Sequence, residues 1–229
     1  MAPHIAQWDR EAHFPVELVP KMGDLGLFGL VVPEQYGGAD ADFMSLVVAI
    51  EELGRVDQSI GITLSAGVGL GINPILSFGS EEQKEQFLPD LVAGRALAAF
   101  GLTEPGGGSD AGATRTRATL DGDQWVLNGA KAFITNSGAD ITSVVTVTAR
   151  TGTNPDGTPQ ISAILVPAGF EIREHHGDSL PHDPPTIDDG DTGKVKPSDS
   201  IATESFCDSM KRSRRGAATA GSGSSPSTT

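Results

Sequence analysis

The chain has 229 residues, and its 30 acidic side chains outnumber the 16 basic ones to give a formal net charge of −14 at pH 7. This acidic balance argues against nucleic-acid binding, which needs a basic surface. The single cysteine, Cys207, excludes an internal disulfide framework and fits a reducing compartment, so the composition indicates a cytoplasmic protein.

Signals for membrane insertion or secretion are not found in the sequence pattern. The first residues carry neither the basic region nor the apolar region of a secretory signal. No uninterrupted apolar run reaches the roughly 18 residues that a membrane-spanning helix needs. We therefore expect no membrane span.

The N-terminal half has the periodicity of helices. Apolar side chains recur at helical spacing over residues 5–14, and because the chain opens inside this pattern we expect a clipped N-terminus. Pro15 fits the first position of a second, short helix. Residues 43–53 carry apolar side chains at i, i+3, i+4 and i+7, which predicts an amphipathic helix whose apolar positions pack into a core.

Two further helices are expected before residue 98. Residues 59–78 are apolar with many small side chains, which predicts a buried helix that packs closely against its neighbours. An S-x-x-Q pattern at residues 80–83 is typical of a capping box and begins the next helix, which Gly94 ends.

The hydrophobic period changes to that of strands at about Ala98. Residues 114–120 and 124–127 alternate on either side of Asp-Gly-Asp, which predicts a hairpin. Residues 141–149 and 161–166 are rich in aliphatic side chains and predict two more strands. Helices followed by short strands indicate an α+β fold, with a helical domain and then an antiparallel β-barrel or sandwich domain.

The composition divides the chain into three parts. We predict an N-terminal helical domain at 1–97, a middle β-domain at 98–174 and a disordered tail at 175–229. The tail is rich in Asp, Ser, Pro, Gly and Thr, and it cannot bury enough apolar surface to offset the entropy of ordering. Its basic run at 211–215 is interpreted as a solvated charge run, and we predict no metal site at His175-His176.

The stretch around which the chain is organised is residues 100–113, FGLTEPGGGSDAGA. Its three consecutive glycines let backbone N–H groups approach a flat or anionic ligand. Thr103 and Ser109 add hydroxyls on either side, a combination that suits a ring with alternating donors and acceptors, or a pyrophosphate. From composition alone, an ordinary glycine-rich surface turn is the alternative interpretation.

Three blocks of this sequence resemble the acyl-CoA dehydrogenase family. The first is GLTE at 101–104 with GGSD at 107–110 and Ala113. The second, NGAKAFITN at 128–136, is similar to the family pattern N-G-x-K-x-W-I-T-N. The third, VPEQYGG at 32–38, is similar to P-E-x-Y-G-G, and the resemblance extends from about residue 3 to about residue 174.

The resemblance implies an FAD-dependent oxidoreductase of fatty acid metabolism. Such an enzyme removes the α-proton of an acyl-CoA thioester and moves the β-hydrogen as hydride to flavin N5. The implied partners are an acyl-CoA substrate, an electron-transferring flavoprotein and, in the intact family, further copies of the chain in a dimer or tetramer.

The resemblance also assigns the flavin contacts. Thr103 is expected at the pyrimidine side of the ring, Ser109 at the flavin pyrophosphate or the substrate thioester arm, and Thr135 near N5. The family usually has Tyr in place of Phe100 and Trp in place of Phe133, so both positions lose a polar handle, with a modest effect expected on flavin affinity. The implied cofactor-binding residues are Phe100, Leu102, Thr103, Gly108, Ser109, Phe133, Ile134 and Thr135, with Ser109 also at the substrate.

Three charged residues inside the motifs are given structural roles. We expect Glu104 to make a local structural bond rather than to act as the base, Asp110 to cap a turn, and Lys131 to be a surface or ion-pair residue.

The sequence contains no identifiable catalytic base. In the family the base is a Glu of a third, helical domain, which is not recognisable here, and we expect a truncated chain whose reading frame changed near residue 174. The alternatives are an inactive fragment that binds only flavin or a homologous subunit, and a flavin-dependent acyl-CoA oxidase or monooxygenase.

Overall fold

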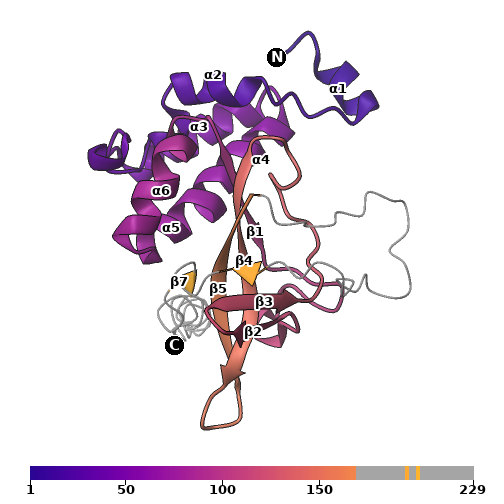
Figure 1. The fold of residues 1–229 in the computed structure, drawn as a ribbon. Coiled ribbons are helices and arrows are strands. Elements are labelled where there is room, and N and C mark those ends of the chain that lie inside the picture. Colours follow the sequence, from indigo (N-terminus) through magenta and orange to yellow (C-terminus); the bar gives the residue numbers. More distant parts are fainter. Residues whose placement is uncertain (169–193, 196–199, 202–229) are drawn as a thin grey trace, which may run out of the picture.

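The computed structural model describes residues 1–168, 194–195 and 200–201. Helices come first along the chain and strands follow, which confirms the α+β order expected from the sequence. Figure 1 shows the helices gathered at one end of two long strands, β4 (Thr142–Thr153) and β5 (Pro159–Pro167). The hairpin of β2 (Arg117–Asp121) and β3 (Gln124–Asn128) lies across the other end.

Polar side chains cap the first turns of three helices, which begin at Phe43, Gln58 and Glu81. The predicted capping box is confirmed, because the Ser80 N–H donates to Gln83 Oε1 at 2.9 Å and the Gln83 N–H donates to Ser80 Oγ at 3.3 Å. The helical segments are α1 (Ile5–Glu11), α2 (Leu18–Asp24), η1 (Leu27–Gly29), η2 (Glu34–Tyr36), α3 (Phe43–Gly54), α4 (Gln58–Ala66), η3 (Gly67–Ile72), α5 (Asn73–Phe78) and α6 (Glu81–Val92).

The predicted buried helix at 59–78 is a continuous helical run, Gln58–Phe78, in which α4 passes through the π-helical segment η3 into α5. A Cβ built on Gly71 would lie 2.8 Å from the Cβ of Ala98 in β1 (Leu97–Gly101), so a glycine here lets the helix approach the sheet closely. Within the described residues this is the one helix long and apolar enough to cross a membrane, yet 61% of that window is buried inside the protein, as in a core helix.

Helix α3 differs from the prediction in how much of its apolar face is covered. Leu46 is buried and Ile50 and Leu53 pack partly against the core, as the spacing predicts. The expectation that Phe43 and Val47 also pack is wrong, because α3 contacts α4 along one side and the other side faces solvent. The exposed large apolar side chains of α3 are Phe43, Met44, Val47 and Val48.

The strands form a mixed sheet that does not close into a barrel. Strand β4 pairs antiparallel with β5, but it pairs in parallel with β1 and, at Arg117 and Arg150, with β2. The prediction of a wholly antiparallel barrel or sandwich is therefore corrected, because alternation along a strand does not encode the direction of its partner. The short strands β6 (Lys194–Val195) and β7 (Ser200–Ile201) pair with β3 and β5, and the rest of the predicted tail lies outside the described residues.

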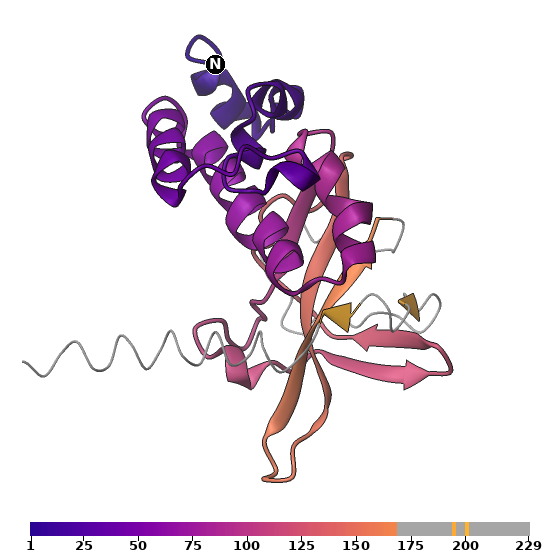
Figure 2. The same cartoon turned by 90° about the vertical axis from the view of Figure 1, so that its left-hand side faces the viewer.

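The core has two parts, one on each face of the central strands. Alternate residues of β1, β4 and β5 point to opposite faces, so Ala98 and Leu165 join the helical core while Ala99 and Ile164 join the other cluster. Figure 2 shows the helices beside the upper part of these strands and the β2–β3 hairpin against the lower part. The two motif segments, at 100–109 and 128–136, lie where these two regions meet.

Candidate functional site

The glycine-rich segment leaves β1 and folds into a tight turn. The Glu104 N–H donates to the Gly107 carbonyl at 2.8 Å, and the Gly107 N–H donates to the Glu104 carbonyl at 3.0 Å. A Cβ built on Gly107 would meet nothing within 4 Å, whereas one on Gly108 would lie 3.2 Å from the side chain of Thr103. The turn is therefore open on its outer side, and Gly108 permits the close approach of Thr103 on its inner side.

The second motif segment, residues 128–136, lies directly against the first. The Ala132 N–H donates to the Thr103 carbonyl at 2.8 Å. A Cβ built on Gly101 would lie 3.4 Å from Lys131 Cγ and 3.5 Å from Ile134 Cδ1. Residues that the sequence assigned to one cofactor site are thus neighbours in space, although they come from different strands.

Gly129, in the same segment, packs directly against Thr116. A Cβ at this position would lie 2.4 Å from Thr116 Oγ1 and 2.6 Å from Thr116 Cα. Any side chain at Gly129 would displace Thr116, which is one of the partners of Glu104.

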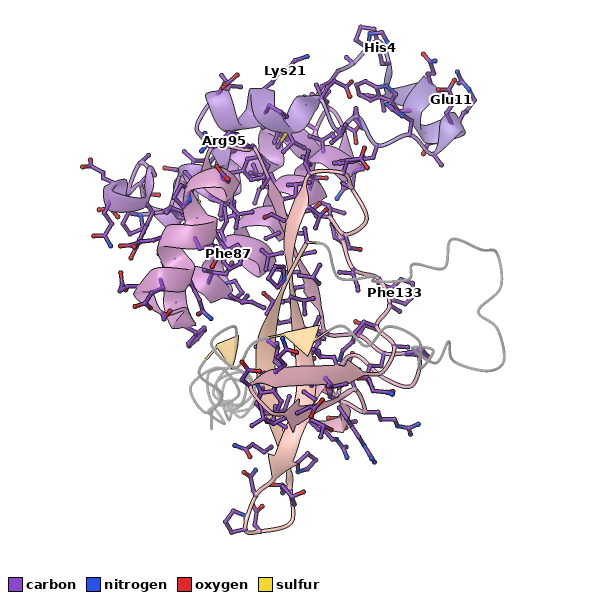
Figure 3. All side chains as sticks on the ribbon, in the orientation of Figure 1. His4, Glu11, Lys21, Phe87, Arg95 and Phe133 are labelled. Carbon is purple, nitrogen blue, oxygen red and sulfur yellow. The ribbon has the colours of Figure 1, made fainter. Side chains whose placement is uncertain are left out.

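Phe133 projects from this loop into solvent (Figure 3). Its side chain is 87% exposed and its backbone φ is +56°, a combination that is unfavourable on both counts for an aromatic residue. Thr135, two residues on, is also exposed. Strained backbone residues cluster at active sites and ligand clamps, so the exposed aromatic side chain at this position points to a functional role.

The loop is fixed at its far end by Asn136. Its side-chain Nδ2 donates to the Thr63 carbonyl of α4 at 3.2 Å, and its own carbonyl accepts from Thr142 Oγ1 of β4 at 2.6 Å. The Phe133 loop is therefore tied both to the helical region and to the sheet.

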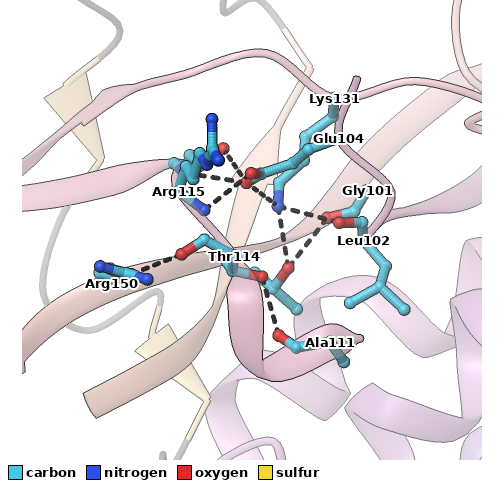
Figure 4. A network of polar contacts seen from close by, with 10 residues as sticks. Gly101, Leu102, Glu104, Ala111, Thr114, Arg115, Lys131 and Arg150 are labelled. Carbon is cyan, nitrogen blue, oxygen red and sulfur yellow. Dashed lines mark hydrogen bonds and ion pairs between the residues drawn. The ribbon is translucent and has the colours of Figure 1, made fainter. Parts of the chain in front are cut away.

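A buried ion pair joins the two motif segments (Figure 4). Lys131 Nζ lies 2.9 Å from Glu104 Oε1, and their side chains are only 6% and 7% exposed. The same ammonium donates to the Leu102 carbonyl at 3.1 Å and to Thr148 Oγ1 at 3.0 Å. The structural role expected for Glu104 is confirmed, although its side-chain partners lie 11 to 27 positions away rather than locally. Of the two alternatives for Lys131, the ion pair is confirmed and the surface position is wrong.

The Glu104 carboxylate is held by donors from the residues that precede β2. Its Oε1 accepts from the N–H and the hydroxyl of Thr116 at 2.8 and 2.7 Å, and its Oε2 accepts from the Arg115 N–H at 2.7 Å. Burial alone raises the pKa of Glu104, but these donors and Lys131 outweigh it and lower the pKa to about 2. Burial lowers the pKa of Lys131, and the contact with Glu104 opposes that shift.

Sequence reasoning did not find Thr116 and Thr148 as partners in this network. Both are buried threonines in or beside strands, where threonine is common, so no local signal distinguishes them. Asp110 stands before the 3-10 turn η4 (Ala111–Ala113), but its side chain makes no capping hydrogen bond, so the predicted cap is not formed.

A concave pocket lies away from the two motif segments. It has a volume of about 320 Å³, opens between β2 and the β4–β5 hairpin, and is lined by Arg117, Arg150 and Gly157 among others. The motif segments instead form an open surface, on which the Gly106–Gly107 turn, Ser109, Phe133 and Thr135 are exposed. We refer to this surface, residues 100–109 with 128–136, as the cradle.

Comparison with known sequences matches both halves of the described chain to one family. Residues 1–95 match the N-terminal domain of acyl-CoA dehydrogenases, and residues 99–187 match the middle domain. The chain belongs to the acyl-CoA dehydrogenase family. Acyl-CoA dehydrogenases are FAD-dependent oxidoreductases of fatty acid metabolism, as the motifs implied.

Curated acyl-CoA dehydrogenases are similar over the same region. An acyl-CoA dehydrogenase of Bacillus subtilis is 47% identical over 168 residues, which are 72% of this chain and 43% of the relative. The mitochondrial short-chain specific acyl-CoA dehydrogenase of Mus musculus is 46% identical over 168 residues, 73% of this chain and 40% of the relative. The chain thus spans about two fifths of the length of these curated relatives.

Solved acyl-CoA dehydrogenase structures share the fold. Butyryl-CoA dehydrogenase from Megasphaera elsdenii superposes with a TM-score of 0.68 at 41% identity, over 73% of this chain and 44% of that one. A glutaryl-CoA dehydrogenase from Mycobacterium smegmatis, solved in complex with FADH2, gives a TM-score of 0.74 at 33% identity, over 89% of this chain and 51% of that one.

Proposed function

We propose that the cradle is the part of an FAD site that the N-terminal and middle domains contribute, in a protein that dehydrogenates an acyl-CoA thioester between its α and β carbons. The observation that carries this proposal is the meeting of the two motif segments, one of which carries the open glycine turn and the other the strained, exposed Phe133. We place the boundary between the helical domain and the β-domain between residues 97 and 98, after the first residue of β1 (Leu97–Gly101).

The residues of the cradle fit a flavin. The turn at 106–107 leaves space for a flat or anionic group, and no side chain at these positions blocks it. We assign Phe100, Leu102 and Thr103 to one edge of the ring, with Gly108 and Ser109 towards the pyrophosphate or the thioester arm. Phe133, Ile134 and Thr135 are assigned to the other face. When bound, FAD supplies the hydride acceptor, and the protein residues orient the ring and exclude water from it.

The exposed guanidinium of Arg115 favours the binding of an anionic group beside the glycine turn. A Cβ built on Gly106 would lie 3.7 Å from Arg115 Cζ, so this side chain lies along the turn. Within the described part of the chain, Arg115 is in no ion pair, in contrast to Arg55 and Arg95, which pair with carboxylates. A cation held here favours binding of a phosphate group.

Glu104 is unsuited to be the base that removes the α-proton. An α-carbon acid is weak, and an efficient base needs a pKa raised towards the working pH and free access to the proton. Glu104 has the opposite properties, because its pKa is lowered to about 2 and both of its oxygens are occupied by donors. We propose that the base is a carboxylate outside the described residues.

The remaining parts of the proposal follow from the relatives. We propose an acyl-CoA substrate, an electron-transferring flavoprotein as the acceptor of electrons, and a homo-oligomeric, cytoplasmic enzyme. Two relatives are named for short or four-carbon acyl groups, which makes butyryl-CoA a suitable probe.

The test is reconstitution with FAD followed by anaerobic addition of butyryl-CoA. We expect the purified chain to take up FAD and to show the absorption of a bound flavin. Butyryl-CoA should then bleach the flavin band in any protein that also contains the carboxylate base. A chain that unfolds cooperatively but takes up no FAD contradicts the proposal. Peroxide formed in air after substrate addition would instead indicate an oxidase.

A further inference from the structure

We propose that Glu104 and Lys131 are positioning residues of the cradle, and that their ion pair holds the loop carrying Phe133 in its strained conformation. This inference rests on the proposed flavin site for its effect on FAD, but the effect on the loop is measurable without any ligand.

Lys131 ties its own loop to two other elements, the segment after β1 and strand β4. An ammonium group has three N–H donors, and here all three have acceptors at 2.9 to 3.1 Å: Glu104 Oε1, the Leu102 carbonyl and Thr148 Oγ1. Leu102 follows β1, and Thr148 is in the middle of β4. Moving the lysine away from any of these acceptors would leave a buried polar group without its partner, which the low dielectric of the interior opposes.

Glu104 completes the network on the other side. Its oxygens accept from two backbone N–H groups and one hydroxyl of Arg115 and Thr116, in addition to Lys131. The carboxylate thus has little freedom to tilt. Because it contacts both the segment before β2 and Lys131, it fixes the lysine relative to that segment.

The strained residue follows directly after this anchor. Lys131 is held by its side chain, Ala132 is held by its N–H on the Thr103 carbonyl at 2.8 Å, and Phe133 then has φ of +56°. Asn136 is fixed beyond it by contacts with α4 and β4. A left-handed backbone at an aromatic residue persists only where its surroundings over-determine it, and these anchors on both sides supply that constraint.

Stability alone does not require an ion pair at this place. A buried ion pair replaced by apolar residues of similar volume is often as stable or more stable. What an apolar pair lacks is the directional hydrogen bonding that fixes one separation between the two motif segments.

The first experiment distinguishes a role of the ion pair in stability alone from a role in positioning the two motif segments. The double variant Glu104→Gln with Lys131→Met removes both charges, so neither is left buried alone. We expect faster hydrogen exchange at the Ala132 amide than in the wild type, an altered visible circular dichroism of bound FAD, and FAD affinity lower by about tenfold or more, equivalent to at least about 1.4 kcal/mol. Wild-type exchange at Ala132 in a folded double variant would overturn the proposal.

A milder pair of variants guards against a double variant that does not fold. Thr148→Val removes one acceptor of Lys131, together with the 3.4 Å hydrogen bond from this hydroxyl to the Gly101 carbonyl, and leaves the ion pair intact. Thr146→Val, two residues away in β4, is the matched control, because its buried hydroxyl has no hydrogen-bond partner among the described residues. We expect faster exchange at Ala132 and weaker FAD binding in Thr148→Val only; equal behaviour of the two variants overturns the inference.

Failure of the proposed function has a different signature. If the wild type binds no FAD, the flavin assignment fails, but exchange at Ala132 still tests the ion pair. If the wild type binds FAD and both sets of variants bind it equally well, with unchanged circular dichroism and exchange, the positioning role fails while the flavin site stands.

Discussion

Replacing the buried Lys131 by Met is expected to destabilise the fold far more than replacing the exposed Arg55 by Met. The change removes three hydrogen bonds and leaves the Glu104 carboxylate buried, with a side chain 7% exposed. Breaking a buried ion pair by removing one partner costs about 3–5 kcal/mol. Because Glu104 keeps its donors from Arg115 and Thr116, we expect a loss of about 3 kcal/mol in the free energy of unfolding at pH 7.

The assay is urea unfolding followed by circular dichroism, with Arg55→Met as the control. Arg55 pairs with Glu52 at 3.0 Å, but both side chains are more than 60% exposed, at 68% and 63%. Such surface pairs contribute less than about 1 kcal/mol, so the control is expected to unfold nearly as the wild type does. The loss in Lys131→Met is expected to shrink in acid, since Glu104 then takes up a proton. Equal effects of the two substitutions at pH 7 would refute the reasoning.

Three further predictions follow from the cradle and the core. As the pH falls from the ordinary pKa of 4.5 towards 2, the wild type should lose up to about 3 kcal/mol in the free energy of unfolding, a loss that Glu104→Gln should not show. Urea unfolding at each pH measures it, and the same dependence of stability on pH in both proteins would contradict the lowered pKa of Glu104. Gly108→Ala should weaken FAD binding in a fluorescence titration, because its Cβ would lie 3.2 Å from the side chain of Thr103; an unchanged affinity would argue against this close contact. Gly71→Ala should cost about 1–3 kcal/mol by overpacking against β1, and Gly69→Ala should stabilise slightly; thermal melting that ranks them otherwise would exclude this packing.

The helices were predictable because their signals are local. The capping box at Ser80 and Gln83 and the apolar spacing around Leu46 lie within one or two turns, and the structure forms both as expected. Periodicity identifies the apolar face of a helix, however, and not the partner that covers it. For this reason the exposure of Phe43 was not predictable from the sequence of α3.

The sheet was predictable as strands but not as a topology. β4 pairs in parallel with β1, whose residues lie more than 40 positions earlier, and the alternation within each strand is the same for either direction of pairing. The β2–β3 hairpin, by contrast, was predicted, because its turn residues are adjacent to both strands.

In the candidate site, too, local features could be predicted from the sequence and long-range contacts could not. The motif residues Thr103, Gly108 and Phe133 could be assigned to a site from the sequence because the blocks are continuous, and their contact with a flavin stays a prediction. The contact of Glu104 with Lys131 spans 27 positions, and the contribution of Thr148 depends on which strand lies beneath the loop. Such long-range contacts require the fold before they can be seen.

The claim that the cradle binds a flavin is tested most directly by titrating the purified chain with FAD and measuring the quenching of flavin fluorescence. The account predicts saturable binding by the wild type and weaker binding when Phe133 is replaced by Asn, which suits the left-handed backbone but lacks the aromatic ring. A chain that melts cooperatively, yet leaves the fluorescence of added FAD unchanged, would contradict it.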